Sequence, residues 1–128
     1  MSLKDRLSVM VVDDMSVSRQ VLAQMLESFG VRDTATVAGG EQALDWLRVH
    51  RADLVISDLN MPGMDGVALL EELRGRPRTH AVRFVLTSGQ DDPARFAAAR
   101  ALGTDAVLVK PFRRDSLLAT VEEIAGRI

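Results

Sequence analysis

Side chains able to do chemistry follow directly after four short apolar runs of this 128-residue chain. They are Asp13 and Asp14 after residues 9–12, Asp58 after residues 54–57, Thr87 and Ser88 after residues 84–86, and Lys110 after residues 107–109. Short, continuous runs rich in Val, Ile and Leu are typical of strands covered on both faces of a parallel sheet. In such sheets ligands bind at the carboxyl ends of the strands. We therefore expect three carboxylates, a hydroxyl group and an ammonium group to share one edge of the sheet.

The three aspartates indicate a cation site. If the strands before Asp13 and Asp58 are neighbours, they lie only about 5 Å apart. Carboxylates this close raise one another's pKa unless a cation neutralises them. Mg²⁺ is the simplest partner, because it prefers a few carboxylates together with waters and a phosphate oxygen. A helix cap would explain Asp13 or Asp14 alone, but it does not explain three acids at adjacent strand ends.

Lys110 adds a positive charge to the same edge. An aspartate nucleophile, a metal ion and a lysine are together suited to phosphoryl transfer onto the aspartate, where positioning and charge neutralisation do most of the catalysis. Thr87 could donate its hydroxyl group to a phosphoryl oxygen. Alone, Lys110 or Thr87 would be an ordinary residue at the end of a strand. Their expected position at the same edge of the sheet is what favours a functional role.

Helical patterns separate the strand-like runs. We expect Ser16 to be the N-cap of the first helix, because apolar residues recur at helical spacing after it. Gly39 and Gly40 open a second helix, which we expect to end near His50. The chain therefore alternates between strand and helix five times, with a weaker, alternating edge strand over residues 34–38. Right-handed crossovers arrange such units as a three-layer α/β sandwich, here a single domain over residues 1–128.

The composition excludes several classes of protein. A net charge of −2 argues against a general nucleic-acid binder. The absence of cysteine excludes disulfides, thiolate catalysis and zinc–thiolate sites. No apolar stretch approaches the roughly 20 residues that cross a bilayer, and the N-terminus lacks the apolar core of a signal peptide. We expect a cytoplasmic protein with neither a nucleic-acid nor a membrane partner.

Four segments together resemble the receiver (CheY-like) domain of bacterial two-component response regulators. They are Val11–Asp14, Asp58–Gly66, Thr87–Ser88 and Val109–Phe112. The resemblance extends from about Leu7 to the end of the chain, and it is closest to stand-alone chemotaxis regulators. It implies a five-stranded parallel sheet of strand order 2-1-3-4-5 with five helices, as in flavodoxin-like folds, and no fused output domain.

The resemblance also implies a role for the acidic residues. Asp58 would accept a phosphoryl group. Mg²⁺ would be held by Asp13, Asp14 and Asp58 and by the backbone carbonyl of Asn60. Asn60 and Gly89 lie where side chains of family members tune the lifetime of the aspartyl phosphate.

The remaining implied roles concern switching. Lys110 would pair with the phosphoryl oxygens, and the Lys110–Pro111 bond is expected to be cis. Thr87, with Ser88 beside it, would supply the hydroxyl that moves toward the phosphate. Val107 occupies the switch position at which many members have Tyr or Phe, so an aromatic swing is not available to this chain.

The implied partners are proteins. A histidine kinase or phosphotransfer protein would donate the phosphoryl group, and the output protein would be a component such as the flagellar motor switch, contacted by a monomer. A phosphate sink or shuttle between phosphohistidine proteins is an alternative, as is a receiver cut from a longer transcription factor.

Two further alternatives belong to other classes. A small Mg²⁺-dependent phosphatase with an aspartyl-phosphate intermediate would share the carboxylates. However, the haloacid-dehalogenase type has a second acid two residues after its nucleophile, where this chain has Asn60. A flavodoxin-like cofactor binder would need a first loop rich in Ser, Thr and Gly, and Asp13 and Asp14 are unfavourable there.

Overall fold

The computed structural model describes residues 6–128, in which five strands alternate with five helices. The strands are β1 (Ser8–Val12), β2 (Asp33–Val37), β3 (Leu54–Asp58), β4 (Arg83–Ser88) and β5 (Ala106–Val109). The helices are α1 (Ser16–Ser28), α2 (Gly40–Leu47), α3 (Gly66–Arg74), α4 (Pro93–Ala101) and α5 (Arg114–Ala125). Residues 1–5, where we expect no signal peptide, lie outside the described residues. None of the helices in residues 6–128 has the length and hydropathy that a membrane crossing requires.

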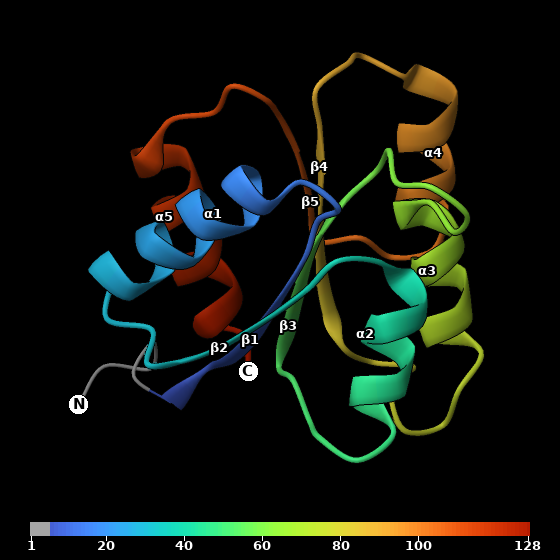
Figure 1. Cartoon of the computed structure of the whole chain (residues 1–128), viewed down its shortest axis with the longest axis horizontal. Helices are drawn as coiled ribbons and strands as arrows, with labels where there is room; N and C mark the ends of the chain where they lie inside the picture. Colours follow the sequence, from blue (N-terminus) through green and yellow to red (C-terminus); the bar gives the residue numbers. More distant parts are fainter. Residues whose placement is uncertain (1–5) are drawn as a thin grey trace.

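The five strands form one parallel sheet in the order β2-β1-β3-β4-β5. The predicted three-layer fold and its strand order are thereby confirmed, with β2 at an edge of the sheet as expected. Figure 1 shows α1 and α5 on one face of the sheet and α2, α3 and α4 on the other. The order reverses at β1, because β2 lies on one side of this strand and β3 on the other. Such a reversal point is where open α/β sheets bind ligands, beyond the carboxyl ends of the strands.

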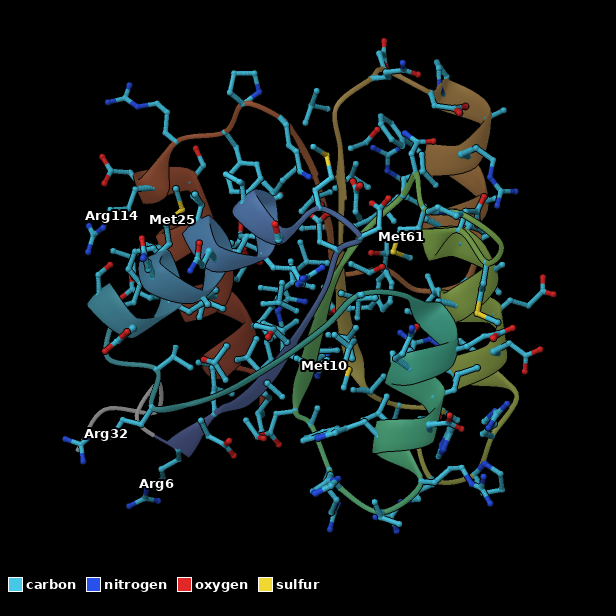
Figure 2. The ribbon with its side chains drawn as sticks, in the orientation of Figure 1. Arg6, Met10, Met25, Arg32, Met61 and Arg114 are labelled. Carbon is cyan, nitrogen blue, oxygen red and sulfur yellow. The ribbon has the colours of Figure 1, made fainter. Side chains whose placement is uncertain are left out.

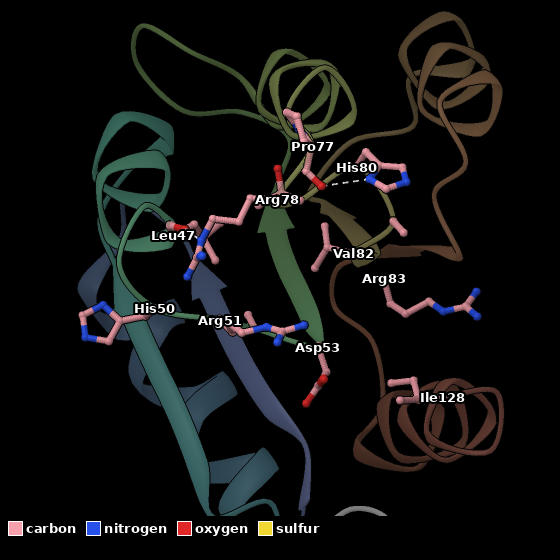
Figure 3. A pocket seen from close by; sticks show the side chains of 13 residues that line it. Leu47, His50, Arg51, Asp53, Pro77, Arg78, His80, Val82, Arg83 and Ile128 are labelled. Carbon is pink, nitrogen blue, oxygen red and sulfur yellow. Dashed lines mark hydrogen bonds between the residues drawn. The ribbon is translucent and has the colours of Figure 1, made fainter.

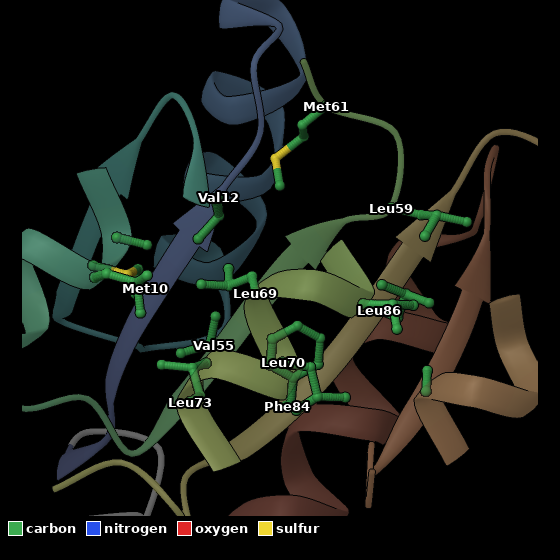
Figure 4. Packing of buried hydrophobic residues seen from close by; sticks show 14 of the residues in the cluster. Met10, Val12, Val55, Leu59, Met61, Leu69, Leu70, Leu73, Phe84 and Leu86 are labelled. Carbon is green, nitrogen blue, oxygen red and sulfur yellow. The ribbon is translucent and has the colours of Figure 1, made fainter. Parts of the chain in front are cut away.

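Each face of the sheet packs against its helices through a separate apolar cluster. Successive side chains of a strand point to opposite faces. Accordingly, Met10 and Val12 belong to the cluster under α2, α3 and α4, whereas Val9 and Val11 belong to the cluster under α1 and α5. Figure 4 shows the first cluster, where strand side chains meet those of α3: Val55, Phe84, Leu69, Leu70 and Leu73. Burial on both faces explains why the strands read as continuous apolar runs.

Two helix ends differ from the prediction. Ser16 is the first residue of α1 and not its N-cap; that position is held by Met15, which makes no side-chain capping bond. Helix α2 ends at Leu47, before the expected end near His50. The His50 ring instead stacks on Trp46, with ring centres 4.3 Å apart, beyond the last helical turn.

Arg114 joins the start of α5 to the end of α1 (Figure 2). Its guanidinium group donates to the hydroxyl oxygen of Ser28 at 3.1 Å from Nε and 2.9 Å from a terminal nitrogen. The same group lies 4.7 Å from the centre of the Phe29 ring. Cation–π contacts of this kind contribute about 0.5–1 kcal/mol at exposed positions. Helix α1, whose first turn faces the carboxyl end of the sheet, is therefore fixed against α5.

Candidate functional site

Three carboxylates meet at the carboxyl end of the sheet. Asp13 follows β1 directly, Asp14 is the next residue, and Asp58 is the last residue of β3. One ligand oxygen from each lies within 4.8 Å of the others. Asp13 is fully buried and Asp58 is 8% exposed, whereas Asp14 is open to solvent. The parallel register, which pairs Val12 with Ser57, is what brings the two strand ends level.

Lys110 extends into this cluster from the end of β5. Its Nζ atom lies 3.1 Å from Oδ2 of Asp13, 3.5 Å from Oδ1 of Asp58 and 3.1 Å from the hydroxyl oxygen of Ser18. Its backbone N–H donates to the carbonyl oxygen of Ser88 at 2.7 Å, and the Lys110–Pro111 bond is cis. The ammonium group thus has three oxygen atoms near its three protons.

The first turn of α1 fixes Asp13. The backbone N–H of Met15 donates to Oδ1 of Asp13 at 3.0 Å, and the guanidinium group of Arg19 donates to the Asp13 carbonyl oxygen at 2.8 Å. With Oδ2 facing Lys110, both carboxylate oxygens of Asp13 have donors. Asp13 is therefore held in one orientation, with its charge directed at the cluster.

Gly66 lets α3 approach Asp58 closely. A Cβ atom on Gly66 would lie 2.5 Å from the Asp58 carbonyl oxygen and 2.7 Å from Cδ1 of Leu86. The helix is capped by Asp65, whose carboxylate accepts a hydrogen bond from the Ala68 N–H at 2.8 Å. An added Cβ atom would overlap these atoms, so only glycine lets the start of α3 lie this close to the strand end that carries Asp58.

The electrostatics of the cluster favour a cation. Burial raises the pKa of Asp58 above its ordinary value, and the nearby charge of Asp13 raises this pKa further. Lys110 lowers the pKa of Asp58, but the net shift of this pKa is upward. Three carboxylates face one ammonium group, so the cluster stays negative when all are ionised.

The donor set fits a hard divalent cation. All three acidic side chains offer oxygen atoms, and exposed Asp14 leaves an open side for water and a phosphate oxygen. Mg²⁺ is bound by proteins in this way, through one or two carboxylates with several retained waters. Asp13, Asp14 and Asp58 are therefore the residues that could hold such an ion.

Thr87 and Ser88 lie beside the cluster, but their hydroxyl groups are used differently. Thr87 is buried and pairs with Asp58 in the register of β3 and β4, and its hydroxyl lies 3.5 Å from the Ser57 carbonyl oxygen. The Ser88 hydroxyl donates to the carbonyl oxygen of Gln90 at 2.7 Å and accepts from the Gln90 N–H at 3.1 Å. Ser88 therefore closes the loop after β4, whereas Thr87 is the hydroxyl next to Asp58.

The other predicted residues lie around the rim of the cluster or away from it. Asn60 is exposed in the loop after β3, and an added Cβ atom at exposed Gly89 would meet no described atom within 4 Å. Val107 is opposite Leu86 in β4 and packs on the cluster under α2, α3 and α4. Its half-buried side chain is thus part of the sheet surface.

Two features of the site were not anticipated from the sequence. Ser18 contacts Lys110, and Arg95 of α4 forms an ion pair with Asp65 of the α3 cap. Ser18 lies shortly after the two aspartates in the sequence. Its place in the first helical turn could therefore have indicated that it lies close to the site. Asp65 and Arg95 are 30 residues apart, and no local pattern connects them.

A hollow of about 420 Å³ lies at the opposite end of the sheet, between the α2–β3 loop and the α3–β4 loop. Figure 3 shows two of its basic residues, His50 and Arg83, at opposite ends of this hollow. Its carboxylate, Asp53, already accepts a hydrogen bond from the Ser8 N–H at 2.9 Å. Chemistry is therefore better supported at the aspartate cluster.

A cation bound by the cluster should stabilise the fold. At a Mg²⁺ concentration 100 times its dissociation constant, the free energy of unfolding should rise by about 2.7 kcal/mol. Asp14→Asn should reduce this gain, because it removes one charge at the open side, whereas Asp91→Asn, an exposed aspartate of the loop before α4, should not. Urea unfolding with MgCl₂, against NaCl of equal ionic strength, measures the effect. Equal gains in wild type and Asp14→Asn would contradict the assignment.

Comparisons with known proteins agree with this geometry. Residues 9–122 match the family model of the response regulator receiver domain. A probable chemotaxis protein CheY from Rhizobium etli is 34% identical over 128 residues, which cover 100% of this chain and 99% of that protein.

Two solved structures are similar. The signal receiver domain of a signal transduction histidine kinase from Syntrophus aciditrophicus has a TM-score of 0.87 at 30% identity, covering 95% of this chain and 92% of that one. The receiver domain of a sensor histidine kinase from Pseudomonas aeruginosa, with a magnesium ion coordinated in its active-site cleft, has a TM-score of 0.84 at 26% identity, covering 94% and 98%. This chain therefore belongs to the receiver domain family of response regulators, whose members are phosphoacceptors, and it is homologous to CheY.

Proposed function

We propose that this chain works as the phosphate-accepting receiver of a two-component phosphorelay, with Asp58 as the acceptor. The observation that carries the proposal is the position of Asp58, between Lys110 and two further carboxylates at one end of the sheet. A phosphohistidine of a histidine kinase or phosphotransfer protein supplies the phosphoryl group. An oxygen of Asp58 attacks phosphorus, the phosphorus–nitrogen bond breaks, and its electron pair stays on the imidazole.

We assign Mg²⁺ binding to Asp13, Asp14 and Asp58, with the backbone carbonyl of Asn60 as a further ligand. Three oxygen donors within 4.8 Å of one another support this assignment. When bound, Mg²⁺ neutralises the charge on the phosphoryl oxygens. The similar receiver domain from Pseudomonas aeruginosa has a magnesium ion coordinated in its active-site cleft.

Lys110 and Thr87 bind the oxygens of the phosphoryl group that Asp58 has accepted. The ammonium of Lys110 already lies 3.5 Å from Oδ1 of Asp58, so it can pair with a phosphoryl oxygen there. The Thr87 hydroxyl is 3.5 Å from its present acceptor, at the long limit of a hydrogen bond, so leaving that contact costs little. Asn60 and Gly89 stand at the rim, where they set how readily water attacks the acyl phosphate.

The new charge then drives the conformational switch. Phosphorylation adds about −1.5 to −2 units of charge and three acceptor oxygens beside Thr87. Thr87 and Lys110 move toward these oxygens, and the bond from the Lys110 N–H to the Ser88 carbonyl oxygen makes the ends of β4 and β5 move together. Val107 follows as a packed strand residue. The surface of α4, β5 and α5 changes as a result, and because a ligand only shifts an existing equilibrium, this state is partly populated beforehand.

We further propose that the output is protein contact in chemotaxis. Homology to CheY over the whole chain supports a role of this kind, with residues 1–128 acting as one monomeric receiver and a flagellar motor-switch component as the partner. The kinase or phosphotransfer protein would dock at α1, where Gln20 and Gln24 are exposed. A phosphate sink or shuttle between phosphohistidine proteins remains the competing role within the family.

Phosphate uptake tests the acceptor. Incubated with MgCl₂ and acetyl phosphate, the wild-type protein should gain one acid-stable, base-labile phosphate, and Asp58→Asn should gain none, because a neutral amide replaces the nucleophilic carboxylate. Asp91→Asn is the matched control and should behave as wild type. Intact-mass spectrometry measures the uptake. Native uptake by Asp58→Asn would contradict the acceptor assignment, and release of many phosphates per molecule would indicate a phosphatase.

Partner binding tests the role in chemotaxis. Phosphorylated protein should bind purified motor-switch protein more tightly than the unphosphorylated form, by a factor of about 5 to 150, as expected when a ligand shifts a two-state equilibrium. Retention of labelled protein on immobilised motor-switch protein measures this difference. Equal retention of both forms, together with rapid return of phosphate to the kinase, would instead support the sink.

A further inference from the structure

Lys110 has an uncharged partner in the first turn of α1. The hydroxyl oxygen of Ser18 lies 3.1 Å from its Nζ atom, as near as the Asp13 carboxylate and nearer than that of Asp58. Ser18 is half-buried, and the side chain of Lys110 is only 25% exposed. The contact joins residues 92 positions apart in the sequence, from elements at different places in the fold.

The three acceptors around Lys110 differ in what a metal ion does to them. Asp13 and Asp58 are carboxylates of the cation cluster. A cation bound to them would offset part of their negative charge and so weaken their attraction to the ammonium group of Lys110. The Ser18 hydroxyl lies outside that set of carboxylates and is uncharged. Its bond to Lys110 is therefore the one that a metal ion does not weaken.

The position of Ser18 is itself fixed. Met15 and Arg19, on either side of it in the sequence, are both hydrogen-bonded to Asp13, at 3.0 and 2.8 Å. The first turn of α1 is thereby tied to the end of β1, and it carries the Ser18 hydroxyl with it. Lysine, in contrast, has a long flexible stem with many accessible rotamers. A fixed acceptor near its tip removes much of that freedom.

From these contacts we propose that Ser18 is a positioning residue, which holds the ammonium group of Lys110 beside Asp58 while the carboxylates bind the metal ion. The proposal rests on the proposed function, in which Lys110 pairs with the phosphoryl group. Ser18 itself takes no part in bond making. It keeps Lys110 ordered at the site, so that less freedom is lost when the phosphoryl group arrives.

The test compares two serines of the same helical turn. Ser18→Ala should slow phosphate uptake from acetyl phosphate in saturating MgCl₂ by about threefold to tenfold, the loss expected for one hydrogen bond to a charged group that water partly replaces. Ser16→Ala, at an exposed position of the same turn, should leave the rate unchanged. Ser18→Thr keeps the hydroxyl group and should restore most of the rate. An unchanged rate in Ser18→Ala would overturn the proposal.

A double-mutant cycle separates positioning from a structural defect. In a Lys110→Ala background, Ser18→Ala should cause no further loss of rate, because the group it positions is absent. A further loss of the same size in that background would overturn the proposal, since Ser18 would then act by another route.

A second measurement does not depend on phosphorylation. The ¹⁵N ammonium signal of Lys110, recorded with MgCl₂, should report an ordered group in wild type and a mobile one in Ser18→Ala. If wild type took up no phosphate but this difference was observed, the proposed function would fail while the positioning contact stood. If Lys110 were equally ordered in both proteins, the positioning role would be wrong whatever the phosphate uptake.

Discussion

The crowding of like charges at the ends of β1 and β3 is the constraint on which the rest of the site depends. The parallel register brings Asp13 and Asp58 level, and burial makes the Asp58 carboxylate costly to ionise. A sheet selected only for stability would not place them there. Lys110 offsets part of this cost by reaching from β5, past the end of β4. The remaining negative charge favours a divalent cation, which in the proposed function helps Asp58 to accept a phosphoryl group.

In the proposed function, the same crowding gives phosphorylation of Asp58 a structural consequence. A phosphoryl group brings more negative charge to a place where every nearby donor is already in use or poorly aligned. Lys110 has three acceptors, and Thr87 has a long hydrogen bond to a carbonyl oxygen. These two residues are the ones that can rearrange, because Asp13 is fixed by α1 and Asp58 is backed by Gly66. In the proposed function the movement therefore occurs at the ends of β4 and β5, while the ends of β1 and β3 stay in place.

Much of the fold could be predicted from the sequence, because burial on both faces gives each central strand a continuous apolar run. The weaker run of β2 likewise indicated an edge strand, and the structure places it at the edge. The order of the strands came from the family resemblance, since apolar runs do not specify which strands are neighbours. Ser16 was wrongly expected to cap α1, since local pattern alone could not show that the Asp13 carboxylate accepts the Met15 N–H there.

The part of the site formed by residues at the carboxyl ends of the strands could be predicted, because these ends lie at one edge of a parallel sheet. Polar residues after apolar runs indicated which carboxylates and which lysine share the edge. The contact of Ser18 with Lys110 and the ion pair of Asp65 with Arg95 were not predictable, because each depends on how a helix lies against a distant element. The close approach of α3 to β3 at Gly66 could not be predicted either, because it depends on how the helix packs against the sheet.

The stability of metal-free Asp58→Asn tests the charge-crowding account most directly. Because burial and Asp13 raise the pKa of Asp58 in the folded state above its ordinary value of 3.8, the folded state binds the proton more tightly than the unfolded state does. The wild type must therefore lose stability as the pH rises above that value, whereas Asn at position 58 cannot titrate. In a chelating buffer, the free energy of unfolding of Asp58→Asn should exceed that of wild type at neutral pH, with the difference shrinking as the pH falls toward 4. A variant less stable than wild type at neutral pH would contradict the account.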